Sequence, residues 1–328
     1  MSGPVLVFVE VAAGEADRVS LETLALVRGV AGALGGAPVE ALLVGEDAAG
    51  VAGSLGAHGV TTAHAVTDPR IAGAYAPGAW GAALAELARA RGAVAVVGSG
   101  TERGAEVLAH AAARLGMPLA ANVVAVTPGD SWRVTRQRWA GSLLEDATLD
   151  APIRCLTIAP HAVPVDEREG VAPAAVAPFA PAVTESDLVV RVTGREAPAA
   201  GSISLADAKV VVSGGRGVGS SDGFRIIEEL AGLLGAAVGV SRAVTSAGWR
   251  PHTEQVGQTG TRVAPDLYVA CGISGAIQHI VGCKSAKRIL AINTDAESPI
   301  MAVADYAVIG DLHTIVPAIS AEIRRRRG

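Results

Sequence analysis

Two glycine-rich turns contain the residue types that hold an anion. The first, Ser213 to Gly219 (SGGRGVG), follows a strand-like run and precedes a helical one. Glycines in such a turn let backbone N–H groups approach a phosphate, and the start of a helix favours negative charge. The dinucleotide fingerprint is broken because Ser220 stands where its third glycine belongs, and the Lys-Ser/Thr pair of a P-loop is absent. By spacing alone, this turn fits a phosphate site and a tight structural turn equally.

A second turn combines glycine with a capping residue. Gly272-Ile273-Ser274-Gly275 joins the strand-like run Leu267–Cys271 to a helical segment that begins at Ala276. We expect Ser274 to cap this helix while the backbone amides of the turn face a pyrophosphate. This junction indicates a phosphate-binding turn more sharply than the first one does.

Polar groups also follow the neighbouring elements. The next strand-like run ends in Asn293-Thr294-Asp295, at the carboxyl edge where open α/β sheets bind ligands. Upstream, Gln255 to Gly260 (QVGQTG) forms a small polar loop with no packing rationale. Two such loops, an Asn and a His that converge on one sheet edge favour a nucleotide site.

The elements that must position these turns alternate between short β-rich runs and helical periodicity. This is the pattern of α/β layers around a mainly parallel sheet. Ser20 is the expected cap of the first helix, which Gly35-Gly36 ends. Further helices are expected at Ala79–Arg91 and Thr101–Leu115. The expected strands of this first domain are Val5–Val11, Val39–Val44, Ala93–Val97, Trp132–Arg138 and Ile153–Ile158.

The chain of 328 residues is long enough for about two domains. Pro and Ala dominate residues 170–201, as in an extended arm or linker, and one strand-like piece, Leu188–Val192, lies inside. A fresh α/β unit begins at Lys209, so we place the boundary near Glu196, with domains at 1–196 and 197–328. The second unit is expected to contain a helix with Phe224, Ile227, Ala231 and Leu234 on one face, and strands at Val210–Val212, Val238–Val240, Leu267–Ala270 and Ile289–Ile292.

Composition excludes several classes of protein. There are 27 Lys and Arg against 32 Asp and Glu, and the net charge of −5 disfavours binding of a nucleic acid by bulk electrostatics. Hydrophobic residues make up 50% and charged residues 18%, which excludes disorder. The three cysteines, Cys155, Cys271 and Cys283, fit reduced thiols without metal-site spacing. With no targeting signal and no membrane span, we expect a cytoplasmic protein that is not embedded in a membrane.

Six segments, taken in order, closely resemble the alpha subunit of electron-transfer flavoproteins: SGGRGVGS, SRAVTSAGW, QVGQTG, LYVACGISGAIQH, AINTDAESPI and VADYAVIGDLHTIVP. The match covers Lys209 to Pro317, whereas the first domain matches loosely in layout. It departs from the family at Cys283, where Met is frequent, and at Thr294, where Lys is common. The resemblance implies a Rossmann-like FAD-binding C-terminal domain and an N-terminal domain that contacts a beta subunit carrying AMP.

The resemblance also implies a role for each matching residue. The Thr259 hydroxyl would lie near flavin N5, the His279 imidazole would donate to the C2 carbonyl, and Arg242 would lie against the ring. The residues implied for FAD binding are Arg216, Ser241, Ser274, Gly275, Ala276, Ile277, Gln278 and His279 around the pyrophosphate; Arg242, Gln255, Val256, Gly257, Gln258 and Thr259 around the flavin ring; and Asn293, Asp311 and Leu312 at the adenosine end.

Residue type alone also allows structural explanations. Arg242 would be a solvated strand end, His279 a partner for a backbone carbonyl and Asp311 an ordinary polar loop residue. In the first domain, Gly98-Ser99-Gly100-Thr101 fits a phosphate turn and a helix cap equally. Since the family carries its nucleotide on that side in the beta subunit, we assign this turn no ligand.

The resemblance implies an electron carrier rather than an enzyme. A reduced flavin bears negative charge near N1 and the C2 carbonyl, so a cation and a hydrogen-bond donor there raise its potential. No nucleophile–base pair or carboxylate dyad stands out in the sequence. The chain would be one half of a heterodimer that takes electrons from flavin dehydrogenases, such as the acyl-CoA dehydrogenases of fatty-acid β-oxidation. It would pass them to a quinone-linked oxidoreductase.

Three alternatives stay open at this point. An NADH-dependent electron-bifurcating complex of the same family would hold a second FAD in its beta subunit. An enzyme with a similar FAD or NAD domain would need catalytic residues in the first domain, where we find none. A nucleotide-binding regulatory module would bind AMP or ATP and show no flavin absorption.

Overall fold

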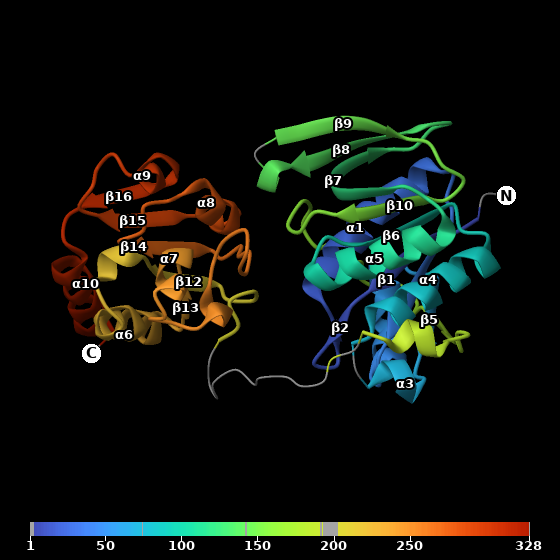
Figure 1. Cartoon of the computed structure of the whole chain (residues 1–328), viewed down its shortest axis with the longest axis horizontal. Coiled ribbons are helices and arrows are strands. Elements are labelled where there is room, and N and C mark those ends of the chain that lie inside the picture. Colours follow the sequence, from blue (N-terminus) through green and yellow to red (C-terminus); the bar gives the residue numbers. More distant parts are fainter. Residues whose placement is uncertain (1–2, 74, 142, 191, 193–202, 328) are drawn as a thin grey trace. The chain divides into compact units, whose positions relative to one another are not determined.

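The computed structural model describes residues 3–73, 75–141, 143–190, 192 and 203–327. The chain divides into two compact units, which we call unit 1 (Met1–Arg195) and unit 2 (Glu196–Gly328) (Figure 1). Each unit contains helices packed on a mainly parallel sheet, which confirms the expected α/β class. The expected boundary at Glu196 lies outside the described residues.

Unit 1 is built on a nine-stranded sheet with the order β11-β5-β4-β1-β6-β10-β7-β8-β9. The strands from β11 to β7 pair in parallel, and β8 and β9 extend the sheet as an antiparallel meander. The strands are β1 Val5–Val9, β4 Val39–Val44, β5 Thr62–Val66, β6 Ala95–Ser99, β7 Leu119–Thr127, β8 Trp132–Arg138, β9 Leu143–Leu149, β10 Arg154–Ile158 and β11 Ala175–Pro178. A separate two-stranded hairpin pairs β2 Val11–Ala12 with β3 Glu15–Ala16.

Helices cover both faces of the parallel part of this sheet. Val5 and Val7 of β1 share one hydrophobic cluster with Leu24 of α1, whereas Leu6 and Phe8 belong to a second cluster with helices α4 and α5. Because both faces are covered, all of β1 is apolar and buried. The helices are α1 Arg18–Ala33, α2 Ala48–Ala52, α3 Pro69–Ala72, α4 Pro77–Arg91 and α5 Glu102–Leu115, with 3₁₀ turns η1 Gly53–His58, η2 Trp139–Gly141 and η3 Glu185–Leu188.

Two sequence expectations about unit 1 are wrong. Ser20 does not cap the first helix, because Asp17 is the N-cap and its carboxylate accepts from Val19 N; the Ser20 hydroxyl instead accepts from Glu10 N. The piece Leu188–Val192 is not a strand. A capping box formed by Thr184 and Asp187 winds residues 185–188 into η3, and residues 189–190 form an exposed bend; residue 191 lies outside the described residues.

Unit 2 contains a five-stranded parallel sheet with the order β13-β12-β14-β15-β16. Its strands are β12 Val210–Gly214, β13 Ala237–Val240, β14 Leu267–Cys271, β15 Ile289–Asn293 and β16 Tyr306–Ile309. Its helices are α6 Arg225–Leu234, α7 Arg242–Ser246, α8 Ile277–Cys283, α9 Pro299–Val303 and α10 Leu312–Arg327, with 3₁₀ turns η4 Arg216–Val218, η5 Asp222–Phe224 and η6 His252–Glu254. The expected face of α6 is apolar, and Ile227 and Ala231 are buried against the sheet.

The expected cap of α8 is also wrong. This helix begins at Ile277, its N-cap is Ala276, and no side chain caps it. The turn before it is fixed from elsewhere, because Ile300 N donates to Ser274 O and Gly275 adopts a left-handed φ of 81°. The helix therefore starts too late for the Ser274 hydroxyl to serve as its cap, and Ser274 stays exposed.

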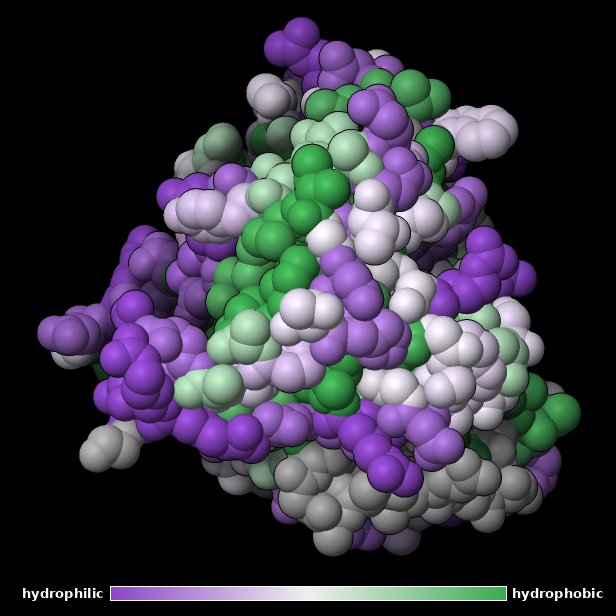
Figure 2. Space-filling view, turned by 90° about the vertical axis from the view of Figure 1, so that its left-hand side faces the viewer, coloured by the Kyte–Doolittle hydropathy of each residue, from purple (hydrophilic) through white to green (hydrophobic). Residues whose placement is uncertain are grey.

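The surface mixes polar and apolar regions. Figure 2 shows an apolar band on one face of the molecule, with hydrophilic side chains on both sides of it. In unit 1, large apolar side chains project into solvent around the β8–β9 turn, where Trp139 is 81%, Leu143 55% and Leu144 68% exposed. Exposed apolar groups of this kind mark contact surfaces. No described helix is both long enough and apolar enough to cross a membrane.

Candidate cofactor site at the carboxyl edge of the second sheet

The strand order of unit 2 defines where a ligand binds. The chain runs from β12 to β13 on one side and then returns to β14 on the other side of β12. The turns that leave β12 and β14 therefore start side by side at a topological switch point. In open parallel α/β sheets the crevice at the carboxyl ends of such strands is the usual ligand site. Both glycine-rich turns singled out in the sequence lie at this point.

The two turns are joined by direct backbone contact. Gly215 N donates to Cys271 O at 2.9 Å, and Gly217 N donates to Gly272 O at 3.0 Å. A Cβ atom on Gly215 would stand 2.2 Å from Gly272 O, so a side chain cannot be placed there without moving the backbone. The glycines of SGGRGVG thus serve to bring the β12 turn onto the β14 turn. The glycine-rich pattern therefore has a packing role, and it also leaves part of the turn exposed.

Two arginines stand at this edge without acidic partners. Ser241 N donates to Gly214 O at 3.1 Å, which places the start of α7, and with it Arg242, next to the turn that carries Arg216. Both side chains are exposed, and neither forms an ion pair with any described residue. Arg250 in the same unit shows the contrast, since it pairs with Glu228 and Glu254. Unpaired cations beside a phosphate-type turn suit an anionic ligand.

The polar loop Gln255–Gly260 is held against the beginning of α8. Gln258 N donates to Gln278 O at 2.7 Å, and a Cβ on Gly282 would lie 2.3 Å from Gly257 N. This close approach of loop and helix requires glycine at both positions. The structure therefore brings the loop and the turn residues Ser274 to His279 together, as the sequence pattern suggested.

Gln255 is built into the loop and does not face outward. Its side chain is 2% exposed; the Oε1 atom lies 2.6 Å from Thr245 Oγ1, and Nε2 lies 3.0 Å from Thr259 Oγ1. Val256 and Gly257 are buried as well, whereas Gln258 and Thr259 are exposed. The loop thus presents Gln258 and Thr259 to a ligand and uses Gln255 to hold Thr259.

His279 is buried with one ring nitrogen unused. Its Nε2 lies 2.8 Å from Tyr268 Oη, while Nδ1 is buried and has no hydrogen-bond partner among the described residues. Burial lowers the pKa of His279 to about 4 and raises that of Tyr268 well above its usual value, so both groups are neutral near pH 7. The imidazole is only 6% exposed and lies almost wholly inside the unit, as the buried partner of the Tyr268 hydroxyl.

The residues expected at the adenosine end have structural duties of their own. Asn293 Nδ2 donates to Ile273 O at 2.9 Å, and its Oδ1 accepts from Asp295 N. Asp311 precedes α10, and its carboxylate accepts from His313 N at 2.9 Å. Leu312 is buried beside Gly272. These side chains hold the turns in place, and any ligand contact at this end falls on exposed parts of the same turns.

Tyr268 and Thr245 were not among the residues predicted for the site. One signal was present, since Tyr268 is the one residue with a polar group in the otherwise apolar run Leu267–Ala270, and a buried tyrosine hydroxyl needs a partner. The cysteines add no chemistry, because burial raises the pKa of Cys271 and of Cys283 to about 12. No group of three metal-ligating side chains occurs among the described residues.

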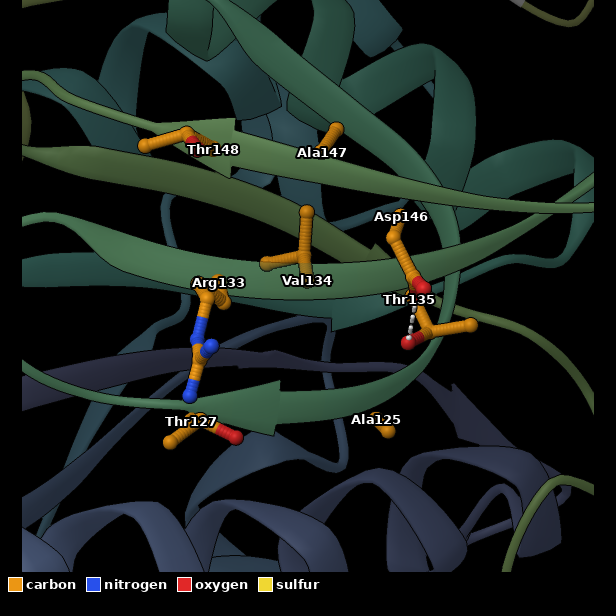
Figure 3. A pocket seen from close by; sticks show the side chains of 8 residues that line it. All are labelled: Ala125, Thr127, Arg133, Val134, Thr135, Asp146, Ala147 and Thr148. Atoms are coloured by element: carbon orange, nitrogen blue, oxygen red, sulfur yellow. Dashed lines mark hydrogen bonds between the residues drawn. The ribbon is translucent and has the colours of Figure 1, made fainter.

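A hollow of about 370 Å³ lies in unit 1, on strands β7, β8 and β9 (Figure 3). Its walls are short side chains, with Thr135 donating to Asp146 at 2.6 Å and Arg133 extending along one end. It contains no nucleophile beside a base, and none of the expected cofactor residues lies in this unit. We read it as part of an exposed sheet surface and not as a reaction site.

The fold and the site together define an α/β protein with a nucleotide-type site at the switch point of its C-terminal sheet. Comparison with known proteins agrees: the electron transfer flavoprotein domain matches residues 5–184, and the electron transfer flavoprotein FAD-binding domain matches residues 204–284. The chain belongs to the electron transfer flavoprotein alpha-subunit family.

Relatives named electron transfer flavoprotein subunit alpha match over nearly the whole chain. The protein of Thermoanaerobacterium thermosaccharolyticum is 33% identical over 97% of both chains. That of Mycobacterium leprae is 38% identical over 94% of this chain and 99% of its own. A shorter match, to the protein of Paracoccus denitrificans, reaches 58% identity over 119 residues, or 36% of this chain and 39% of that one.

The residues present fit the FAD that this family implies. Arg216 and Arg242, exposed and without ion pairs to described residues, suit its charge, and exposed Gln258 and Thr259 offer polar groups at the same edge. Ile277 is 65% exposed beside these polar groups, which gives the site an apolar surface for an aromatic ring. The fit therefore rests on exposed side chains of this chain that are available to a ligand.

Proposed function

We propose that this chain is the alpha subunit of a heterodimeric electron-transfer flavoprotein and that unit 2 binds FAD at the carboxyl edge of its sheet. One observation carries the proposal. Backbone hydrogen bonds join the two glycine turns, and a further bond joins the loop Gln255–Gly260 to α8. Arg216 and Arg242 stay without ion pairs to described residues at that edge. Bound FAD would supply the one-electron chemistry, and the chain would supply binding and electrostatics.

Each part of the site then has a task. Arg216 and the turn Ser274–His279, with Ser241, would hold the pyrophosphate. Arg242 would place a positive charge beside the flavin ring. The Thr259 hydroxyl would lie near N5, and the His279 imidazole would donate a hydrogen bond to the C2 carbonyl. Positive charge and hydrogen-bond donors near the ring favour its reduced, more negative forms and raise the potential. The turns held by Asn293, Asp311 and Leu312 would form the adenosine end.

Unit 1 would bind the beta subunit, which would carry AMP. The exposed apolar residues Trp139, Leu143 and Leu144 border the β8–β9 turn of the antiparallel meander, on an open edge of the sheet. An apolar rim on an uncovered sheet edge suits a protein partner. Leu144→Asp should weaken co-purification of the beta subunit, whereas Val176→Asp, at the opposite edge strand, should leave it intact. Equal loss in both variants would remove this surface from the proposal.

In the cell, the heterodimer would act as a cytoplasmic carrier and not as an enzyme. It would take electrons from flavin dehydrogenases, including acyl-CoA dehydrogenases, and pass them to a quinone-linked oxidoreductase. The exposed Arg216 and Arg242 support this proposal, because they offer an anionic cofactor groups that bind it and stabilise its charge.

The test is the visible spectrum of the chain co-expressed with its beta subunit, together with chromatography of the nucleotides released by heat. One FAD and one AMP per heterodimer would support the carrier. Two FADs would favour the NADH-dependent bifurcating complex instead. A colourless heterodimer that cannot be reconstituted with FAD would refute the proposal.

A further inference from the structure

A short chain of hydrogen bonds runs from α7 to the exposed end of the polar loop. Gln255, which is 2% exposed, lies between Thr245 Oγ1 and Thr259 Oγ1, at 2.6 Å and 3.0 Å. Thr245 Oγ1 also lies 3.0 Å from the carbonyl oxygen of Arg242. Thr259 is the exposed end of this chain. The buried amide therefore connects the backbone beside Arg242 to the hydroxyl that faces the site.

Each hydroxyl has one hydrogen to donate, so the chain has a direction. In the first arrangement Thr245 donates to Gln255 Oε1, and Gln255 Nε2 donates to Thr259 Oγ1. The Thr259 hydrogen is then free, and Thr259 acts as a donor toward the site.

The second arrangement uses the same heavy-atom positions. The two ends of a glutamine amide have nearly the same shape, so a half turn of the amide exchanges oxygen and nitrogen without displacing its neighbours. Gln255 Nε2 then donates to Thr245 Oγ1, and Thr245 donates to the Arg242 carbonyl oxygen. Thr259 donates to Gln255 Oε1, and its oxygen faces the site as an acceptor.

We propose that Gln255 is a positioning residue whose amide orientation decides whether Thr259 donates or accepts at the cofactor. This inference rests on the proposed function, in which Thr259 lies near flavin N5. An unprotonated N5 accepts a hydrogen bond, whereas a protonated N5 donates one. The amide turns over to match, and the side chains of Thr245, Gln255 and Thr259 each keep a hydrogen-bond partner in both arrangements. Gln255 acts only through Thr259.

That dependence can be measured with a double-mutant cycle in the FAD-loaded heterodimer. Gln255→Met keeps the length of the side chain and removes both polar ends, while Thr245 keeps the Arg242 carbonyl as its acceptor. We expect Gln255→Met to shift the midpoint potential of the flavin in a spectroelectrochemical titration, because the Thr259 hydroxyl is no longer held by an amide that turns over to match the protonation of N5. In a Thr259→Ala background the same change should produce no further shift. Thr253→Ala, on exposed η6, is the matched control and should leave the potential unchanged.

A second readout follows the amide itself. In protein labelled with ¹³C at the glutamine side-chain carbonyl, the reduced-minus-oxidised infrared spectrum should contain a shifted amide band that disappears in Gln255→Met. If that variant does not fold, Thr245→Val removes the other anchor of the Gln255 amide, and the shift in potential that it causes should likewise vanish in a Thr259→Ala background.

The outcomes separate this inference from the proposed function. A wild-type heterodimer without FAD refutes the proposed function. A heterodimer with FAD in which the Gln255 and Thr259 effects simply add, or in which the labelled band is absent, overturns the role of Gln255 alone.

Discussion

Replacing Gly215 with alanine tests whether the two turns at the switch point depend on direct backbone contact. A Cβ at this position would lie 2.2 Å from Gly272 O and 2.7 Å from Ile273 Cα. Both neighbours are backbone atoms, so no flexible side chain can move aside. The conformation of Gly215, with φ −106° and ψ −170°, is extended backbone that alanine also adopts. The substitution therefore tests steric contact without adding backbone strain.

The expected loss of stability comes from the hydrogen bonds that must open. To restore ordinary contact with Gly272 O, the turns have to separate by about 1 Å. This lengthens the Gly215 N–Cys271 O and Gly217 N–Gly272 O bonds, which measure 2.9 Å and 3.0 Å. A buried backbone group left without a partner costs about 1–3 kcal/mol. With two bonds affected, we expect the free energy of unfolding of unit 2 to fall by about 2–5 kcal/mol.

Unit 2 can be followed separately in the full chain by pulsed hydrogen exchange in urea, read from peptides that contain β12 and β14. The matched control is Gly232→Ala on α6, where a Cβ meets nothing within 4 Å. That change should raise the free energy of unfolding by about 0.5–1 kcal/mol, since alanine favours a helix. If Gly215→Ala lowers stability by less than about 1 kcal/mol, the turns are not held by contact and the reasoning is refuted.

Three further predictions concern charge. Burial raises the pKa of Glu10 to about 7, so the folded chain holds a proton that the unfolded chain releases near pH 4.5. Glu10 should therefore weaken folding by up to about 3 kcal/mol above pH 7, and Glu10→Gln should remove this loss between pH 4.5 and 7; an unchanged pH profile of urea unfolding contradicts it. His279, whose pKa burial lowers to about 4, should stay neutral down to that pH in a ¹⁵N NMR titration of the apo chain, and a midpoint above pH 6 would show that the ring is not buried. Since an unfolded histidine charges near pH 6.5, this group also costs stability as the pH falls from 6.5 to 4. Arg242→Ala should retain FAD and lower its potential, with exposed Arg225→Ala as control; equal potentials in the two variants would dismiss the role of Arg242.

Some strands could be predicted from the sequence with their full bounds, whereas others, such as β7, were not predicted. The expected bounds of Val39–Val44 and Trp132–Arg138 are those of β4 and β8. Caps were less predictable, because several side chains near a helix start can accept the same backbone hydrogen. Asp17 takes the place expected for Ser20, and Ser20 is used elsewhere by Glu10 N. Ser20 Oγ also lies 3.1 Å from Ser99 Oγ on β6, a contact between residues distant in sequence.

The turns of the candidate site could be recognised in the sequence, but the contacts that bring them together could not. The glycine turns and the polar loop carry recognisable residue types, and sheet topology brings both turns to one edge. The burial of Gln255 could not be foreseen, since it follows from the approach of Gly257 to Gly282 on a helix some twenty-five residues further along the chain. The pairing of Tyr268 with His279 likewise joins a strand to the helix that follows it. Neither contact can be predicted from the hydrophobic periodicity of a single helix or strand.

The sign of the charge at each switch point explains why the candidate site lies in unit 2. Unit 1 has its own switch point, because β1 lies between β4 and β6. There Thr101 caps α5 by accepting from Gly104 N and donates to Glu10 at 2.5 Å, so the turn Gly98–Thr101 serves as a helix cap beside a carboxylate. Burial raises the pKa of Glu10 to about 7, so a phosphate at that helix end would be repelled by Glu10 once this carboxyl ionises above that pH. In unit 2 the corresponding edge carries Arg216 and Arg242. The two switch points thus differ in charge, since a buried carboxyl lies at the first and two exposed arginines lie at the second, and this difference supports the proposal that an anionic cofactor binds to unit 2.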